Sequence, residues 1–414
     1  MKGCNYLNKN QEFLTKVLSA AIRGSSFDIS GWSDIDFPAV MDEAELHQVH
    51  TLIYPILNEY LNSTDLESLS VWKLRINSSA ALHIQYNHSI LQLLKEFDAA
   101  GISAVALKGL VVRNLYNCPE LRIMYDADIL VKLSDIKRSK EILASSGYKL
   151  FESSSKHYHY ICKNKISVEL HKQLLDHRFF VNANQFEKEV WNNLQTTNLG
   201  LCSVKVLVPQ YELLYLCMHS AIHMMLDGFG LRQLCDIVLF IESNNSEINW
   251  DLFEEMISYY GIAKYTKALF RLCEILLDFH SPIRLLQDEA DEKNMEDLIQ
   301  YIFSGGVFGC NDIDHLIVNK MSRYSSFNGM EPTPGKLKSR LSFIFPSADK
   351  IDTTYHYAKK HPMLLPVAWI HRIFVSLFRK DYTLSDKLRF LHSNVTATNS
   401  LDRAKLLHWM NLIH

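Results

Sequence analysis

Glycine and proline are scarce in this chain, with 15 and 10 residues respectively among 414. Together they make up about 6% of the sequence, half of the ~12% that is usual for this pair. Both residues interrupt regular structure, so a chain with so few of them is expected to be mostly helical. The scarcity argues against a sandwich, propeller or barrel, because these folds need many turns.

The chain also lacks an excess of charge of one sign, since 43 Lys and Arg stand against 46 Asp and Glu. Charge alone therefore predicts no broad nucleic-acid surface. No charge-free apolar run reaches the ~18 residues of a membrane span; the nearest, 363–378, contains His371 and Arg372. The eight cysteines form no C-x-x-C pair, and residues 1–21 have no signal-peptide core. We expect a cytoplasmic protein with reduced thiols and no stable membrane insertion.

Hydrophobic periodicity divides the chain into three regions. Residues 1–98 are predicted to be helical, with apolar residues at helical spacing in 46–57 and 78–97. Residues 99–208 are predicted to form a small mixed-sheet α/β core, and residues 209–414 a second helical domain. The predicted fold class is therefore α+β and predominantly α overall.

The expected core alternates short strands and helices. Strands are predicted at 102–107, 126–131, 157–162 and 166–171, and helices at 110–116 and 134–146. The last two strands would form a hairpin around residues 163–165. Further helices are predicted at 211–226, 231–242 and 252–279.

Three carboxylates in this core are candidates for metal binding. Asp126 and Asp128 are two residues apart on a predicted strand, which places both on one face. The two repel each other unless a cation lies between them, and oxygen ligands suit Mg²⁺. By the same reasoning, Asp128→Asn would be neutral or stabilising without metal. Glu169 on another strand would complete a two-metal site. The alternative is a strand cap at Asp126, a solvated Asp128 and an ion-paired Glu169.

Lys108 and Gly109 lie between a predicted strand and a predicted helix. Backbone N–H groups at such a turn attract phosphate, and Lys108 adds a positive charge. A phosphate site followed by paired carboxylates has the two parts that nucleotidyl transfer requires.

Several other polar residues allow two interpretations each. Arg122 contacts a phosphate, or it pairs with Asp126 or Glu120. His171 shares the face of Glu169 and contacts nucleotide or metal, or makes a structural hydrogen bond.

The following helices carry two further pairs with the same ambiguity. Arg232 forms an intrahelical ion pair with Asp236, or points at a triphosphate. His219 and His223 have a spacing that suits zinc, or they line a domain interface near the cleft.

The stretches ALKG at 106–109, LRIMYDADILV at 121–131 and VELH at 168–171 resemble nucleotidyltransferase motifs. Within that superfamily, which has the DNA polymerase β-like fold, the chain resembles a bacterial family of uncharacterised nucleotidyltransferases. Similar features continue at 213–223, 230–236 and 345–347, so the resemblance spans most of the chain. One departure is that Leu110 follows Gly109, where the superfamily has a second glycine or a serine.

The resemblance implies roles for particular residues. Asp126, Asp128 and Glu169 would be catalytic and would bind two Mg²⁺ ions. The triphosphate and nucleotide would be bound by the following residues: Lys108, Gly109, Arg122, His171 and Arg232.

The implied reaction transfers a nucleotidyl group from an NTP, expected to be ATP, to an acceptor, with release of pyrophosphate. The acceptor is unidentified and is a small molecule, a protein or an RNA; the oligomeric state is not determined by the sequence. One alternative is a catalytically inactive nucleotidyltransferase-like binding or antitoxin-type protein. Another is a metal hydrolase that uses His219 and His223.

Overall fold

The computed structural model divides the chain into two compact units, which are described separately. The first comprises residues 1–224 and 229–307, and the second comprises 225–228 and 308–414. The structure describes these residues: 6–61, 67–154, 156–162, 166–176, 179–199, 202–226, 228–285, 289–306, 345, 347–348, 351, 355–378 and 396–413.

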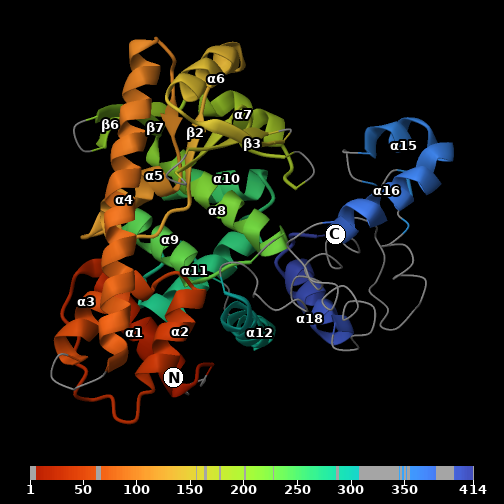
Figure 1. Cartoon of the computed structure of the whole chain (residues 1–414). Helices are drawn as coiled ribbons and strands as arrows, with labels where there is room; N and C mark the ends of the chain where they lie inside the picture. Colours follow the sequence, from red (N-terminus) through yellow and green to blue (C-terminus); the bar gives the residue numbers. More distant parts are fainter. Residues whose placement is uncertain are drawn as a thin grey trace. The chain divides into compact units, whose positions relative to one another are not determined.

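A seven-stranded mixed sheet lies at the centre of the first unit (Figure 1), with the strand order β3-β4-β5-β2-β1-β7-β6. β2 runs parallel to β5 and β1 parallel to β7, whereas the other neighbouring pairs are antiparallel. The strands are β1 (Val105–Ala106), β2 (Asp126–Leu130), β3 (Lys149–Ser153), β4 (His157–Ile161), β5 (Ser167–His171), β6 (Leu194–Leu199) and β7 (Cys202–Leu207). All seven fall within the predicted 99–208 core.

The two faces of the sheet differ in chemistry because side chains alternate along each strand. Ala127 and Ile129 of β2, with Val168 and Leu170 of β5, join one apolar core with residues of the long helix α4 (Glu67–Ala99). Asp126, Asp128, Glu169 and His171 occupy the intervening positions and face the other way. The alternation that buries one face therefore collects the polar side chains on the other.

Helices surround the sheet and make the fold α+β and predominantly helical, which confirms the predicted class. α4 runs lengthwise past the sheet and continues down to α1–α3 (Figure 1). The other helices of the first unit are α1 (Lys9–Arg23), α2 (Phe37–Leu46), α3 (His50–Leu61), α5 (Gly109–Val112), η1 (Arg113–Leu115), η2 (Pro119–Leu121), η3 (Leu133–Asp135), α6 (Ile136–Ser145), α7 (Ala183–Val190), α8 (Pro209–Leu226), α9 (Leu231–Asn244), α10 (Trp250–Tyr259), α11 (Ala263–Leu277) and α12 (Glu289–Gly305).

Some elements differ from the prediction. The helix predicted over 252–279 is two helices, α10 and α11, because Gly261 between them adopts φ +75°, a left-handed conformation that ends a helix. The predicted strand 102–107 is reduced to β1, and β3, β6 and β7 were not predicted. The hairpin of β4 and β5 forms as expected; its turn, residues 163–165, lies outside the described residues.

The regular secondary structure described in the second unit is helical. It contains α15 (His356–Lys360), η5 (Pro362–Leu364), α16 (Leu365–Phe378) and α18 (Thr396–Trp409). A small apolar core joins Ile351, Tyr355, Ala358 and Ala368. In the described part of the chain, no helix is long and apolar enough to cross a membrane.

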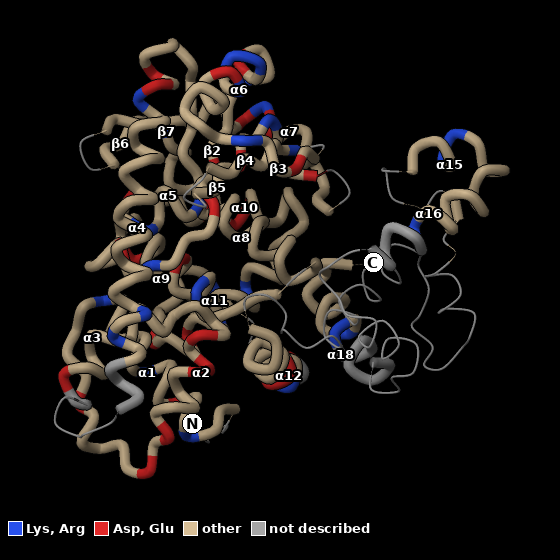
Figure 2. Tube along the Cα trace, viewed as in Figure 1, with Lys and Arg blue, Asp and Glu red and all other residues tan. Residues whose placement is uncertain are grey.

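Acidic and basic positions are interspersed along the described trace of the first unit (Figure 2), in keeping with a net charge of −3.

Candidate active site

The three candidate carboxylates lie on adjacent parallel strands. Asp128 of β2 and Glu169 of β5 are direct partners in the strand register. His171 joins them, because its Nε2 donates to Asp128 Oδ1 at 2.8 Å and lies 3.2 Å from Glu169 Oε2. Since both oxygens contact the same nitrogen, they are at most about 6 Å apart. Asp126, two residues before Asp128, lies at the start of the same face.

Lys108 directs its ammonium group at this cluster. Its Nζ donates to Asp128 Oδ1 at 2.7 Å, and the pair is buried, with side chains 10% and 6% exposed. Burial opposes ionisation of Asp128, but Lys108 and His171 hold the pKa of that carboxyl well below its usual range. The expectation of uncompensated repulsion at Asp128 is therefore wrong: an internal cation already neutralises it.

At Asp126, the positive charges of Lys108 and Arg232 do not offset burial and like-charge repulsion. Burial, followed by the neighbouring charges of Asp128 and Glu169, raises the pKa of Asp126 to about 6. A carboxyl whose pKa is raised by burial and by neighbouring like charges would gain from an added cation. The three carboxylates therefore fit a divalent ion such as Mg²⁺ in donor type and in electrostatics.

The backbone of Lys108 adopts an unusual conformation, with φ 48° and ψ −119°. Such strained positions persist only where the surroundings hold them. Here the backbone N–H of Lys108 donates to Glu212 Oε1 of α8 at 2.9 Å, and the side chain is held by Asp128. Lys108 Nζ also lies 5.6 Å from the centre of the Tyr215 ring. α8 thus fixes the turn at which the phosphates were predicted to bind.

Gly109 is buried at the start of α5 and contacts side chains of the site. A Cβ at this position would lie 3.0 Å from both Arg122 Nη1 and Met124 Sδ. These contacts give a packing reason for glycine in addition to the predicted approach of a ligand.

Arg122 does not pair with Asp126 or Glu120. Its Nε donates to Asp236 Oδ1 at 3.1 Å, its Nη2 donates to Asp236 Oδ2, and its Nη1 donates to Ile123 O at 3.0 Å. Tyr116 donates a further hydrogen bond to Asp236 Oδ1 at 2.8 Å. The guanidinium of Arg122 and the carboxylate of Asp236 therefore form a buried bidentate ion pair. This pair anchors the segment before β2 to α9.

Arg232 does not form the expected ion pair with Asp236. Its Nη1 donates to Ile123 O at 3.1 Å, while its Nε is buried without a hydrogen-bond partner among the described residues. Burial and the nearby Arg122 lower the pKa of Arg232 to about 10. Arg232 therefore retains a donor for a ligand, whereas Arg122 has its donors directed at the protein.

His219 and His223 contact each other, with their Nε2 atoms 2.9 Å apart. Burial, and then Lys108, keeps the pKa of His219 well below its ordinary value, so this imidazole is neutral. In the described residues, the cluster with metal-ligand spacing is instead His157, Glu169 and His171. Among the described residues, no third metal ligand lies with His219 and His223, which argues against the metal hydrolase alternative.

Sequence reasoning missed His157, Glu212 and Tyr215. The alternation of histidine and tyrosine at 157–160 was a signal for His157, because every second residue of a strand shares a face. Glu212 was detectable as a lone carboxylate in the apolar run 211–218. Burial raises the pKa of Glu212 to about 8, so it is a neutral acid over most of the physiological range.

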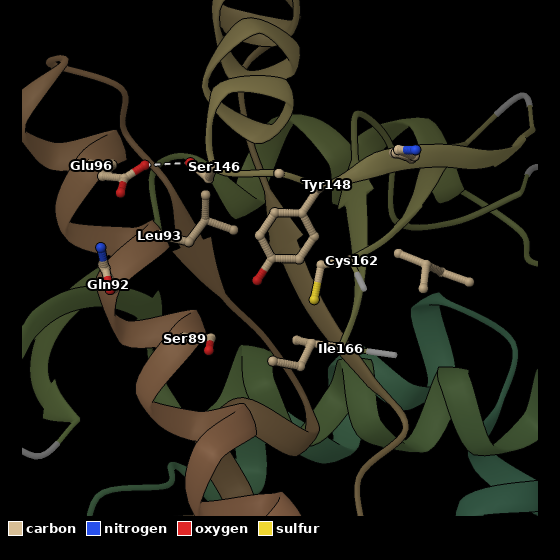
Figure 3. Close-up of a pocket in the computed structure, with 11 residues that line it drawn as sticks. Ser89, Gln92, Leu93, Glu96, Ser146, Tyr148, Cys162 and Ile166 are labelled. Carbon is tan, nitrogen blue, oxygen red and sulfur yellow. Dashed lines mark hydrogen bonds between the residues drawn. The ribbon is translucent and has the colours of Figure 1, made fainter. Parts of the chain in front are cut away.

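A hollow of about 680 Å³ lies elsewhere, between α4 and the segments 146–149 and 161–166 (Figure 3). Ser89, Leu93 and Glu96 of α4 line it, opposite Tyr148 and Cys162. Leu93, Tyr148 and Cys162 belong to the apolar face, so the sheet separates this hollow from the carboxylates. None of the predicted site residues lines it.

Comparison with families of known proteins gives a match. The family described as uncharacterised nucleotidyltransferase matches residues 33–278, which contain α2 to α11 and every residue of the site. No curated protein and no solved structure matches the chain.

Proposed function

Because the chain belongs to the uncharacterised nucleotidyltransferase family, we propose that it transfers a nucleotidyl group from an NTP to an acceptor and releases pyrophosphate. The observation that carries the proposal is the convergence of Asp128, Glu169 and Lys108 on one face of two parallel strands. Carboxylates able to bind Mg²⁺, beside a cation able to contact phosphate, match the needs of phosphoryl chemistry.

Asp126, Asp128 and Glu169 would hold two Mg²⁺ ions, which supply positive charge to the attacking and leaving oxygens. Lys108 would leave Asp128 and contact the triphosphate, because its flexible side chain can exchange one anion for another. Gly109 would allow the phosphates to approach the start of α5.

Arg232, whose buried Nε has no hydrogen-bond partner among the described residues, would contact the nucleotide. Arg122 would act on the nucleotide through the position of the segment before β2, since Asp236 and Ile123 occupy its donors.

In the reaction, the acceptor oxygen or nitrogen bonds to the α-phosphorus while the bond to pyrophosphate breaks. Glu169 would orient the acceptor and help to remove its proton, and His171 would keep Glu169 beside Asp128. ATP as the donor and the cytoplasm as the location belong to the proposal as well. The proposed acceptor is a small molecule, a protein or an RNA.

The test measures thermal melting and pyrophosphate release with Mg²⁺ and each NTP. Mg²⁺ with a non-hydrolysable NTP should raise the melting temperature of the wild type, since a ligand of the folded state stabilises it. Asp98→Asn, at an exposed position of α4, is the control and should respond as the wild type does. Asp128→Asn should lose the response. Binding without pyrophosphate release over all acceptor classes would favour the inactive binding protein, and no response in the wild type would contradict the proposal.

A further inference from the structure

Two histidines and a glutamate come together at the join of β4 and β5. His157 of β4 is directly opposite His171 of β5 in the antiparallel register, and their ring centres are 5.1 Å apart. Glu169 lies two residues before His171, on the same face. The three side chains therefore point to one place from two hydrogen-bonded strands, which hold them rigidly.

The spacing of the ligand atoms suits a metal ion. His171 Nε2 lies 3.2 Å from Glu169 Oε2, and His157 Nε2 lies 3.6 Å from Glu169 Oε1. One ligand atom from each residue can be chosen so that all lie within 4.8 Å of one another. A tetrahedral ion with bonds of 2.0–2.1 Å needs its ligand atoms about 3.3 Å apart. Small side-chain adjustments would bring the three groups to that spacing.

The donor types select the kind of ion. Mg²⁺ prefers a shell made of oxygen atoms, whereas imidazole nitrogen favours borderline ions such as Zn²⁺. We propose that His157, Glu169 and His171 bind a first-row transition-metal ion, with Zn²⁺ the best fit to two imidazoles and one carboxylate. Three protein ligands are the number that leaves a coordination position open for water.

The burial of the cluster agrees with an open site. His171 is 6% exposed, while His157 and Glu169 are 25% and 20% exposed, so one side reaches solvent. His171 Nε2, which donates to Asp128 Oδ1 at 2.8 Å in the metal-free protein, would release its proton to bind the ion. Glu169 would be shared with the Mg²⁺ positions of the proposed reaction, but binding of Zn²⁺ does not depend on that reaction.

The experiment titrates Zn²⁺ into metal-free protein by calorimetry and follows Co²⁺ binding by visible absorption, without nucleotide. The wild type should bind one Zn²⁺ per chain, far more tightly than Mg²⁺. His157→Ala and the milder His157→Gln should weaken binding more than 10-fold, since even loss of an outer partner of a metal ligand costs ~10–100-fold. Circular dichroism would show that each variant is folded.

His159→Ala is the matched control. His159 lies on the same strand and face as His157, but its Nε2 contacts Ser167 Oγ. This variant should bind Zn²⁺ as the wild type does. Equal Zn²⁺ affinity in the wild type and the His157 variants, or equal losses in the His157 and His159 variants, would overturn the proposed site. Because no NTP is present, either failure leaves the nucleotidyltransferase proposal to its own melting test.

Discussion

The ammonium of Lys108 is hydrogen-bonded to Asp128, 2.7 Å from Oδ1, within the side of the sheet that carries the three carboxylates. Twenty residues separate the two in sequence, on opposite sides of a helical segment. The candidate phosphate-binding residue is therefore the internal counter-ion of a candidate metal ligand. In the proposed reaction, binding of Mg²⁺ and NTP would replace one buried ion pair by several new ones.

Asp128→Asn should abolish pyrophosphate release and destabilise the metal-free protein. The amide removes a charge from a buried pair and leaves Lys108 uncompensated, which costs up to about 3–5 kcal/mol. This expectation reverses the one drawn from charge repulsion in the sequence. Urea unfolding of wild type and variant without metal measures the change, and Asp98→Asn is the exposed control. Unfolding at the same urea concentration in all three would contradict the importance of the pair.

Lys108→Met should weaken binding of Mg–NTP by about 1.5–3 kcal/mol, because a charge-assisted contact to phosphate is lost. It should also destabilise the free protein, since Asp128 keeps its buried charge. In the double variant Lys108→Met/Asp128→Asn, both charges are gone. Its loss of stability should therefore fall short of the sum of the single losses by about 0.5–3 kcal/mol. Additive losses would show that the two side chains are not coupled.

The stability of the protein should depend on the ionisation of Glu212. Burial raises the pKa of its carboxyl from 4.5 to about 8, so the folded state binds a proton that the unfolded state releases. The stabilisation is complete below the unfolded pKa of about 4.5 and is lost as pH rises towards 8. Thermal melting from pH 5 to 9 should show this decline in the wild type.

Glu212→Gln is the matched variant for that experiment. Its amide oxygen can still accept the hydrogen bond from the backbone N–H of Lys108, but it does not titrate. The difference in melting temperature between variant and wild type should therefore move in favour of the variant as pH rises. Parallel pH profiles of the two proteins would assign the titration to another group.

Substitutions of Arg232 and Asp236 should have separate effects, one mainly on ligand binding and the other mainly on the stability of the fold. Asp236→Asn leaves the buried Arg122 without its ionic partner, so it should destabilise the protein by about 3–5 kcal/mol. Arg232→Ala removes a single hydrogen bond to Ile123 O, so its loss of stability should be smaller. It should nevertheless weaken binding of Mg–NTP, which titration calorimetry measures. Unchanged NTP affinity in Arg232→Ala would remove this residue from the nucleotide site.

Local spacing in the sequence determined much of the core. Asp126 and Asp128 share a face because strand side chains alternate, and the same rule places Glu169 and His171 together. Apolar periodicity located the helices that follow the sheet. The helix break at Gly261 was not predicted, because apolar residues continue at helical spacing across it.

Only the tertiary structure decided which charges meet. Glu212 lies 104 residues from Lys108, and Asp236 lies 114 residues from Arg122, so no local pattern connects them. The spacing in the sequence suggested an ion pair between Asp236 and Arg232, four residues apart on the same helix. In the structure, α9 packs against the segment before β2, and Asp236 forms its ion pair with Arg122 instead. These pairs form because a charged side chain that is buried away from water is costly unless it is paired. The fold determines which partner lies within reach. The sequence therefore determined the polar face of the sheet, and the packing of α8 and α9 determined the partners and ionisation states of its residues.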